Sequence, residues 1–112
     1  MSLQSGSVVI VHLRDPTEKL WGVLEVIDPV GVHLHALNLS SFDDWIAQAA
    51  SGSPPTLGLA TMFVPLFRVE RMFLDEQVGE VESYCQRFER RVGVSVEAFL
   101  GLTGEDFDEV PS

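Results

Sequence analysis

Several features are scarce in this sequence, and each shortage excludes a class of protein. The chain has one cysteine, Cys85, which excludes an internal disulfide and a multi-thiolate metal site. Its longest apolar run, around Val8–Val11, is far shorter than the roughly twenty residues that a membrane-spanning helix needs. The first residues lack the basic segment of a signal peptide. We therefore expect a protein of the reducing cytoplasm without a membrane span.

Basic residues are scarce as well. Seven Lys and Arg stand against seventeen Asp and Glu, so the formal net charge is −10 and the isoelectric point is near 4.5. Nucleic acids and anionic membranes bind proteins largely through Lys and Arg, so this charge argues against DNA, general polyanion and membrane partners. The 112 residues, 46% of them hydrophobic, suit one small domain with its own core.

Hydrophobic periodicity predicts a β-rich first part of the chain. The predicted strands span 8–13, 19–28, 32–39, 61–64 and 69–74. Val8–Leu13 is β-branched without interruption, which is typical of a strand covered on both faces. Gly22 lies inside the second strand, where glycine costs stability unless the sheet bends or another backbone comes close. Short strands, tight turns and this glycine together favour a bent antiparallel sheet that curls into a small barrel.

Two later stretches change to the helical period. A stripe of Phe42, Trp45, Ile46 and Ala49 predicts a helix that Ser40 or Ser41 caps. A second helix is expected from about Glu80 to Arg91, with a short one at Ser95–Leu100. We divide the chain into a barrel at 8–75 with a helical insertion at about 41–50, a C-terminal helical extension at 80–101 and an acidic tail at 102–112.

Three stretches carry a family resemblance: Trp21–Asp28, Val32–Leu34 and Phe63–Met72. In strand order and residue pattern they resemble the Sm-like fold, in which a short strand feeds a long bent strand with a glycine near the bend. The resemblance implies a mainly β fold with α-helices: a five-stranded bent antiparallel barrel of Sm-like or SH3-like type. This chain adds the inserted helix and the C-terminal helical extension.

The residues through which Sm-like proteins bind RNA are missing at the matching positions. An Asn in the turn after the strand-ending Asp contacts a base in those proteins, and the nearest position here is Gly31. The Arg-Gly pair of the family would fall near Val64-Pro65. RNA is therefore a doubtful partner, and single-stranded RNA binding by a divergent member is the alternative function.

What the resemblance implies about assembly is more useful. Sm-like barrels pair the fourth strand of one subunit with the fifth strand of the next and close into rings, because exposed strand edges carry unpaired backbone groups. The predicted interface residues are Thr61, Met62, Phe63, Val64, Val69, Met72 and Phe73. We expect a non-enzymatic assembly or protein-interaction module that forms a homo-oligomer or binds a protein partner.

The remaining candidates for chemistry each have a plainer explanation. His12, His33 and His35 form a zinc site only if all three converge on one side of the barrel; otherwise they are strand histidines. Cys85 lies on the apolar stripe of its helix and is expected to be a buried core thiol. We predict no catalytic residue, no cofactor and no metal.

The basic residues of the last third also have two explanations. Arg87, Arg90 and Arg91 lie on one helix, and the short helix after Gly93 gives the pair a faint likeness to a helix-turn-helix unit. DNA readout needs groove-facing cations, whereas the charge on the second helix is Glu97. The alternative is that the arginines stabilise the negative end of their own helix.

Overall fold

The computed structural model describes residues 3–52, 54 and 56–101. The chain divides into two compact units, Met1–Asp75 and Glu76–Ser112, and each is described by itself. The predicted acidic tail at 102–112 lies outside the described residues.

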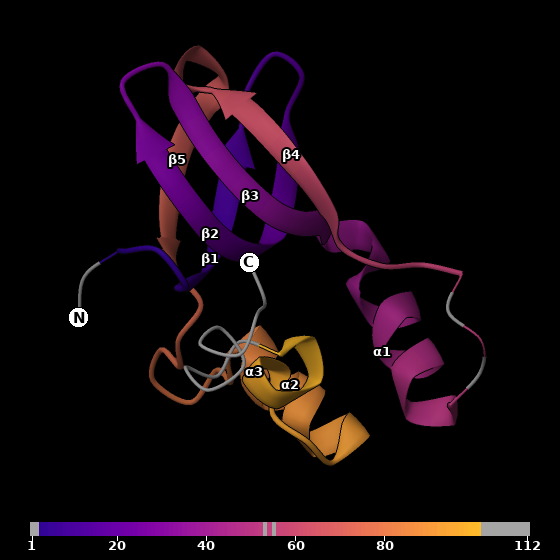
Figure 1. The fold of residues 1–112 in the computed structure, drawn as a ribbon. Coiled ribbons are helices and arrows are strands. Elements are labelled where there is room, and N and C mark those ends of the chain that lie inside the picture. Colours follow the sequence, from indigo (N-terminus) through magenta and orange to yellow (C-terminus); the bar gives the residue numbers. More distant parts are fainter. Residues whose placement is uncertain (1–2, 53, 55, 102–112) are drawn as a thin grey trace. The chain divides into compact units, whose positions relative to one another are not determined.

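The first unit is built on an antiparallel sheet. Its five described strands are β1 (Val8–Leu13), β2 (Glu18–Asp28), β3 (Gly31–Asn38), β4 (Ala60–Pro65) and β5 (Val69–Leu74). The strand order is β4-β3-β2-β1-β5, so β4 and β5 are the two outer strands (Figure 1). The prediction of a β-rich fold with helices is confirmed.

The expected closed barrel is not what forms. Within the described residues, β4 pairs with β3 and β5 pairs with β1, and no ladder joins β4 to β5. The short 3-10 helix η2 (Leu66–Arg68) carries the chain from one edge of the sheet to the other, so the two strands it connects are not neighbours (Figure 1). Register shifts in the β2–β3 and β1–β5 ladders bend the sheet without closing it.

The glycine inside β2 is required by a close backbone approach. A Cβ placed on Gly22 would collide with the carbonyl oxygen of His35 and would lie 2.5 Å from the Cβ of Ala36. Gly22 and Ala36 are direct partners in the β2–β3 ladder. Of the two explanations that the sequence offered for Gly22, close approach of a neighbouring strand is therefore the correct one.

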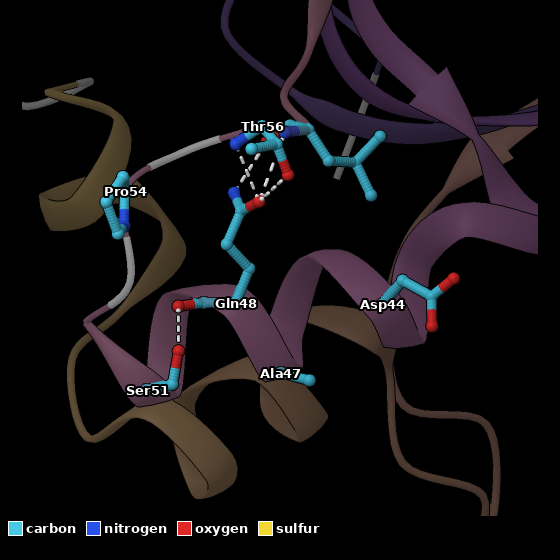
Figure 2. Close-up of a pocket in the computed structure, with 7 residues that line it drawn as sticks. Asp44, Ala47, Gln48, Ser51, Pro54 and Thr56 are labelled. Atoms are coloured by element: carbon cyan, nitrogen blue, oxygen red, sulfur yellow. Dashed lines mark hydrogen bonds between the residues drawn. The ribbon is translucent and has the colours of Figure 1, made fainter.

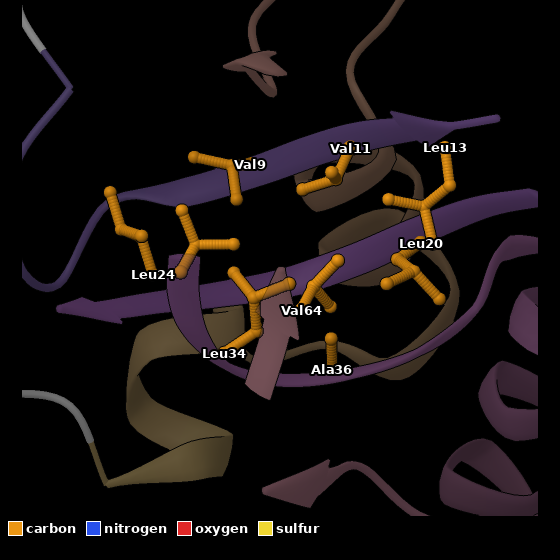
Figure 3. Close-up of a cluster of buried hydrophobic side chains, with 9 residues drawn as sticks. Val9, Val11, Leu13, Leu20, Leu24, Leu34, Ala36 and Val64 are labelled. Atoms are coloured by element: carbon orange, nitrogen blue, oxygen red, sulfur yellow. The ribbon is translucent and has the colours of Figure 1, made fainter. Parts of the chain in front are cut away.

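One face of the sheet holds a continuous aliphatic core. The core residues are Val9, Val11, Leu13, Leu20, Leu24, Val32, Leu34, Ala36 and Val64 (Figure 3). Met62, Val69, Met72 and Leu74 from the two outer strands pack against this cluster and are partly buried. We call this side the core face, and the opposite side of the sheet the outer face.

The outer face is covered by an aromatic group from β2 and the inserted helix. The ring of Trp21, which is fully buried, lies 4.9 Å from Phe42 and 5.4 Å from Trp45 between centroids. Its indole Nε1 donates a 3.0 Å hydrogen bond to Asp75 Oδ2 just after β5. Asp75 is therefore the polar partner of a buried indole.

The inserted helix α1 (Phe42–Ser51) follows the 3-10 turn η1 (Leu39–Ser41). The predicted caps are displaced by a few residues: the side chain of Asn38 accepts from Ser40 N–H at the start of η1, and Ser41 makes no side-chain cap. Gly52, in the left-handed conformation at φ 72°, ends α1.

The second unit contains two short helices, α2 (Tyr84–Val92) and α3 (Val96–Leu100). The helix expected from Glu80 begins only at Tyr84, because Ser83 and Gln86 form a capping box that fixes its first turn. Gly93 ends α2 in the left-handed conformation, and the Ser95 side chain caps α3 by accepting from Ala98 N–H.

Candidate interaction edges

The β4 edge presents unpaired backbone groups at alternate residues. Leu66 N–H donates to the Val30 carbonyl at 2.9 Å, which makes these two residues a hydrogen-bonded pair. Antiparallel ladders alternate bonded and non-bonded pairs, so the β3–β4 register places Thr61 and Phe63 in non-bonded pairs. Their N–H and C=O groups point away from β3. Pro65 has the same parity and contributes a carbonyl only.

The same reasoning applies to the β5 edge. Asp75 N–H donates to the Val8 carbonyl at 2.9 Å, and the register then makes Phe73 a bonded partner of Ile10. Met72 and Leu74 belong to non-bonded pairs, so their backbone groups point away from β1. Both edges of the described sheet are therefore open to another strand.

The residues predicted as an interface fall into two groups. Val64 is buried in the core, and Met62, Val69 and Met72 pack against it. Among these four, Met72 presents outward backbone groups on β5, whereas Met62 and Val64 direct their backbone groups at β3. The side chains that remain accessible are those of Thr61, Phe63 and Phe73, with 46% of Phe63 and 39% of Phe73 exposed.

Each edge phenylalanine packs against a histidine of the neighbouring strand on the outer face. The ring centroids of Phe63 and His33 are 5.0 Å apart, and those of Phe73 and His12 are 5.2 Å apart. Across the sheet, His33 is the ladder partner of both Phe63 and Val26. Val26, His33 and Phe63 therefore form a transverse row on the outer face, which we call the edge row; it ends at the β4 edge.

Gly31 leaves the space that the Phe63 ring of this row occupies. A Cβ at Gly31 would collide with the Phe63 ring and would lie 2.5 Å from the Val64 carbonyl oxygen. Any side chain at this position, including the Asn of the RNA-binding Sm-like proteins, would displace Phe63. Glycine is therefore required at position 31 so that Phe63 of β4 can pack over it.

The three histidines do not form a metal site. His33 contacts Asp28, His35 contacts Thr61, and His12 contacts Phe73. Among the described residues, no three His, Cys, Asp or Glu side chains gather closely enough to hold a metal ion.

Asp28 organises the β2–β3 turn next to the edge row. Its Oδ1 accepts hydrogen bonds from the N–H groups of Val30 and Gly31, both at 3.0 Å, and its Oδ2 lies 3.0 Å from His33 Nε2. The N–H of Val30 and then the His33 ring hold the pKa of Asp28 below its ordinary value of 3.8, because both stabilise the carboxylate.

His12, beside the β5 edge, lies where its charged form is disfavoured, whereas the charged form of Asp28 is favoured. Partial burial lowers the pKa of His12, and the charges of Lys19 and Arg71 lower it further, while Glu70 opposes them. Each of the first three effects disfavours the imidazolium form.

The basic residues of α2 are partly engaged with acidic neighbours. Arg90 Nη2 lies 2.6 Å from Glu82 Oε2, Arg87 Nε lies 3.9 Å from the same oxygen, and the Arg87 guanidinium also covers the Tyr84 ring. Glu82 precedes the helix, which is an arrangement the sequence did not indicate. Cys85 is partly exposed rather than fully buried, which corrects its assignment as a core thiol.

Two arginines at one end of the sheet are also engaged. Arg14 Nε donates to the Phe67 carbonyl at 2.9 Å, while Arg68 donates to the carbonyls of Arg14 and Pro16. Arg68 also pairs with Glu18 at 3.2 Å. These bonds tie the β1–β2 turn to η2, and no local sequence signal could have indicated a connection across more than fifty residues.

Sequence reasoning also missed the side chain that orders the loop after α1. Gln48 Oε1 accepts from Thr56 N–H at 2.8 Å, from the Thr56 hydroxyl at 2.9 Å and from Leu57 N–H at 3.1 Å. Its Nε2 donates to the Leu57 carbonyl at 2.8 Å. Figure 2 shows the depression that Gln48 lines with Asp44, Ala47 and Ser51. The loop thus engages both the oxygen and the nitrogen of the Gln48 amide.

The comparisons add no family to this geometry. No family model matches the chain, and neither a curated protein nor a solved structure matches it. Within the described residues, no helix has the length and apolar character to cross a bilayer.

Proposed function

We propose that this protein is a non-enzymatic assembly module that associates with other chains through the edge strands of its sheet. The observation that carries the proposal is the open pair of edges: Thr61 and Phe63 on β4, and Met72 and Leu74 on β5, have outward backbone groups. Such groups pair readily with another strand.

The composition of β4 supports the same proposal. Proteins that avoid edge pairing place charged residues, especially Lys, along an exposed edge strand. Ala60–Pro65 carries no charged side chain, and Pro65 blocks only the last of its outward N–H positions. Phe63 adds accessible apolar area directly beside the backbone groups. β4 therefore lacks most of the usual protection against pairing.

One substitution separates edge pairing from folding. In Thr61→Pro the lost N–H is one that points away from β3, so the internal ladder keeps its bonds, whereas Thr61→Val keeps the N–H and has nearly the same shape. Both variants lose the 3.4 Å contact between the Thr61 hydroxyl and His35 Nδ1, which makes them a matched pair.

Light scattering as a function of concentration provides the measurement. The wild type and Thr61→Val should exceed the 12.4 kDa of one chain at micromolar concentration. Thr61→Pro should weaken association about fivefold for each hydrogen bond lost at the contact, since each is worth about 1 kcal/mol. A wild type that stays monomeric at all accessible concentrations would contradict the proposal.

Single-stranded RNA binding stays a prediction that rests on the Sm-like resemblance. It is tested by titrating labelled oligonucleotides at low salt, where any phosphate-driven affinity is strongest. Absence of binding under those conditions would eliminate it.

A further inference from the structure

We infer that the partner of the β4 edge is β4 of a second copy of this chain, in antiparallel pairing around a two-fold axis at Phe63. This inference rests on the proposed function and specifies its partner and register. Three features of the described residues support it: the order of the outward backbone groups, the sides on which the side chains lie, and the distribution of charge.

The outward groups of β4 are self-complementary in this register. Thr61, Phe63 and Pro65 have outward parity, and a two-fold axis at Phe63 sets Thr61 of each copy opposite Pro65 of the other. The two Phe63 residues exchange a pair of N–H···O bonds, as in any hydrogen-bonded antiparallel pair. Each Thr61 N–H then donates to a Pro65 carbonyl, whereas the Thr61 carbonyl finds no donor there because proline has no N–H, so the two copies share four backbone bonds centred on Phe63.

The side chains distinguish this pairing from the ring-forming one. Residues directly opposite each other in an antiparallel pair project to the same side. Thr61 and Phe63 project to the outer face, where they contact His35 and His33, whereas Met72 and Leu74 project to the core face.

Antiparallel pairing of β4 with β5 of another copy would therefore join the outer face of one sheet to the core face of the next. Parallel pairing would keep the faces matched, but it is less stable per residue. Antiparallel β4–β4 pairing keeps the outer faces together without that loss.

The two-fold arrangement also brings apolar surfaces together. The edge row of Val26, His33 and Phe63 would meet its copy across the axis, with the Phe63 rings adjacent. Half of Val26 and nearly half of Phe63 are exposed in the isolated chain, at 51% and 46%. Covering them stabilises association in proportion to the apolar area removed from water.

Charge favours β4 over β5 as the self-pairing edge. Two copies of a chain with a net charge of −10 repel each other, so the contact is best made where neither copy carries charge. β4 is uncharged along its length, while β5 carries Glu70 and Arg71. Glu70 also occupies the register shift of the β1–β5 ladder, which interrupts the regular edge.

Amide hydrogen exchange on the wild-type protein tests the inference directly. In a β4–β4 dimer the amides of Thr61 and Phe63 should exchange at least about tenfold more slowly at high than at low protein concentration. Those of Met72 and Leu74 should not change. Protection of all four amides would indicate β4–β5 pairing and overturn the inference, while the proposed function would survive.

Cysteine cross-linking in a Cys85→Ser background gives an independent test. Phe63→Cys should form a disulfide-linked dimer under mild oxidation, because paired Cα atoms about 5.5 Å apart are within disulfide range. Thr61→Cys is the matched control on the same face, since its two copies would lie about 14 Å apart along the strands.

The outcomes separate the two proposals. Cross-linking of Phe63→Cys but not Thr61→Cys supports the two-fold register. A Phe63→Cys protein that still associates by light scattering but does not cross-link overturns the register alone. A wild type that is monomeric at every concentration, with all four edge amides exchanging equally at high and low concentration, overturns the register and the proposed function together.

Discussion

At the scale of single residues, Gly22 has the most clearly defined requirement. A Cβ there would meet the backbone of His35 and the Cβ of Ala36 rather than the end of a flexible side chain. Gly22→Ala should therefore cost about 2–3 kcal/mol of unfolding free energy, at the upper end of overpacking effects. Gly58→Ala is the control, because nothing lies within 4 Å of the added Cβ. Urea denaturation measures both, and a Gly22→Ala protein as stable as Gly58→Ala would contradict the expected clash.

Asp28 provides the second residue-scale prediction. Its pKa is lowered in the folded state, so its contribution to stability is present above 3.8, the ordinary value, and is lost as the pH falls through the lower folded pKa. Asp28→Asn removes this contribution. The stability difference between wild type and Asp28→Asn should be constant near pH 6 and shrink below pH 3.8. Urea midpoints across pH 2–6 measure it, and a difference that grows on acidification would contradict the prediction.

His12 extends this reasoning to milder pH. Its pKa is lowered from the ordinary value of 6.5, mainly by burial. Stability from the neutral imidazole is therefore present above 6.5 and is lost as the pH falls through the folded pKa. In His12→Gln the fall in the urea midpoint below pH 6.5 should be shallower than in the wild type. An equal or steeper fall would contradict it.

At the scale of elements, the loop after α1 depends on one side chain from the helix. Gln48→Ala removes four hydrogen bonds to Thr56 and Leu57, so the Thr56 amide should lose its protection from exchange and the loop should become sensitive to proteases. Gln48→Glu is the comparison, because its carboxylate can keep the three accepted bonds while it replaces the donated one with an oxygen that faces the Leu57 carbonyl, so its Thr56 amide should be protected more than in Gln48→Ala. Equal protection of Thr56 in wild type and Gln48→Ala would show that the loop is ordered by other contacts.

The elements themselves were largely predictable, because their signals are local. Alternation and β-branching locate the strands, and Gly52 and Gly93, both in the left-handed conformation, end α1 and α2. The errors fall where a neighbouring polar residue competes for a cap. Asn38 rather than Ser40 or Ser41 starts the first helical segment, and Ser83 delays α2 by several residues. Both kinds of residue have similar capping preferences, so spacing alone does not decide between them.

At the scale of the whole molecule, the sequence predicted the number of strands correctly but wrongly predicted that the sheet closes into a barrel. Closure depends on where η2 delivers the chain, and that path is set by the bonds of Arg14 and Arg68 with carbonyls far away in sequence. The candidate edges were predictable as strands. Which backbone groups point outward followed only from the register, because a shift of one residue exchanges them.

The net charge gives the prediction at this scale. Repulsion between copies carrying −10 each is long-ranged, whereas the backbone bonds of a strand seam depend little on ionic strength. Raising the salt concentration from about 20 to about 300 mM shortens the screening length several-fold and should strengthen self-association. Light scattering at fixed protein concentration checks this, and dissociation by salt would show that the contact is held by ion pairs instead.

A sheet with two unpaired edge strands uses only one of them when it forms a two-fold dimer. If β4 pairs with its own copy, the outward backbone groups of Met72 and Leu74 on β5 are not used by that contact, and a second strand-to-strand contact there would let the assembly grow without limit. The irregularity at Glu70, together with the charges of Glu70 and Arg71, stands at that remaining end. These two residues therefore oppose further strand pairing, which would turn a finite assembly into a fibril.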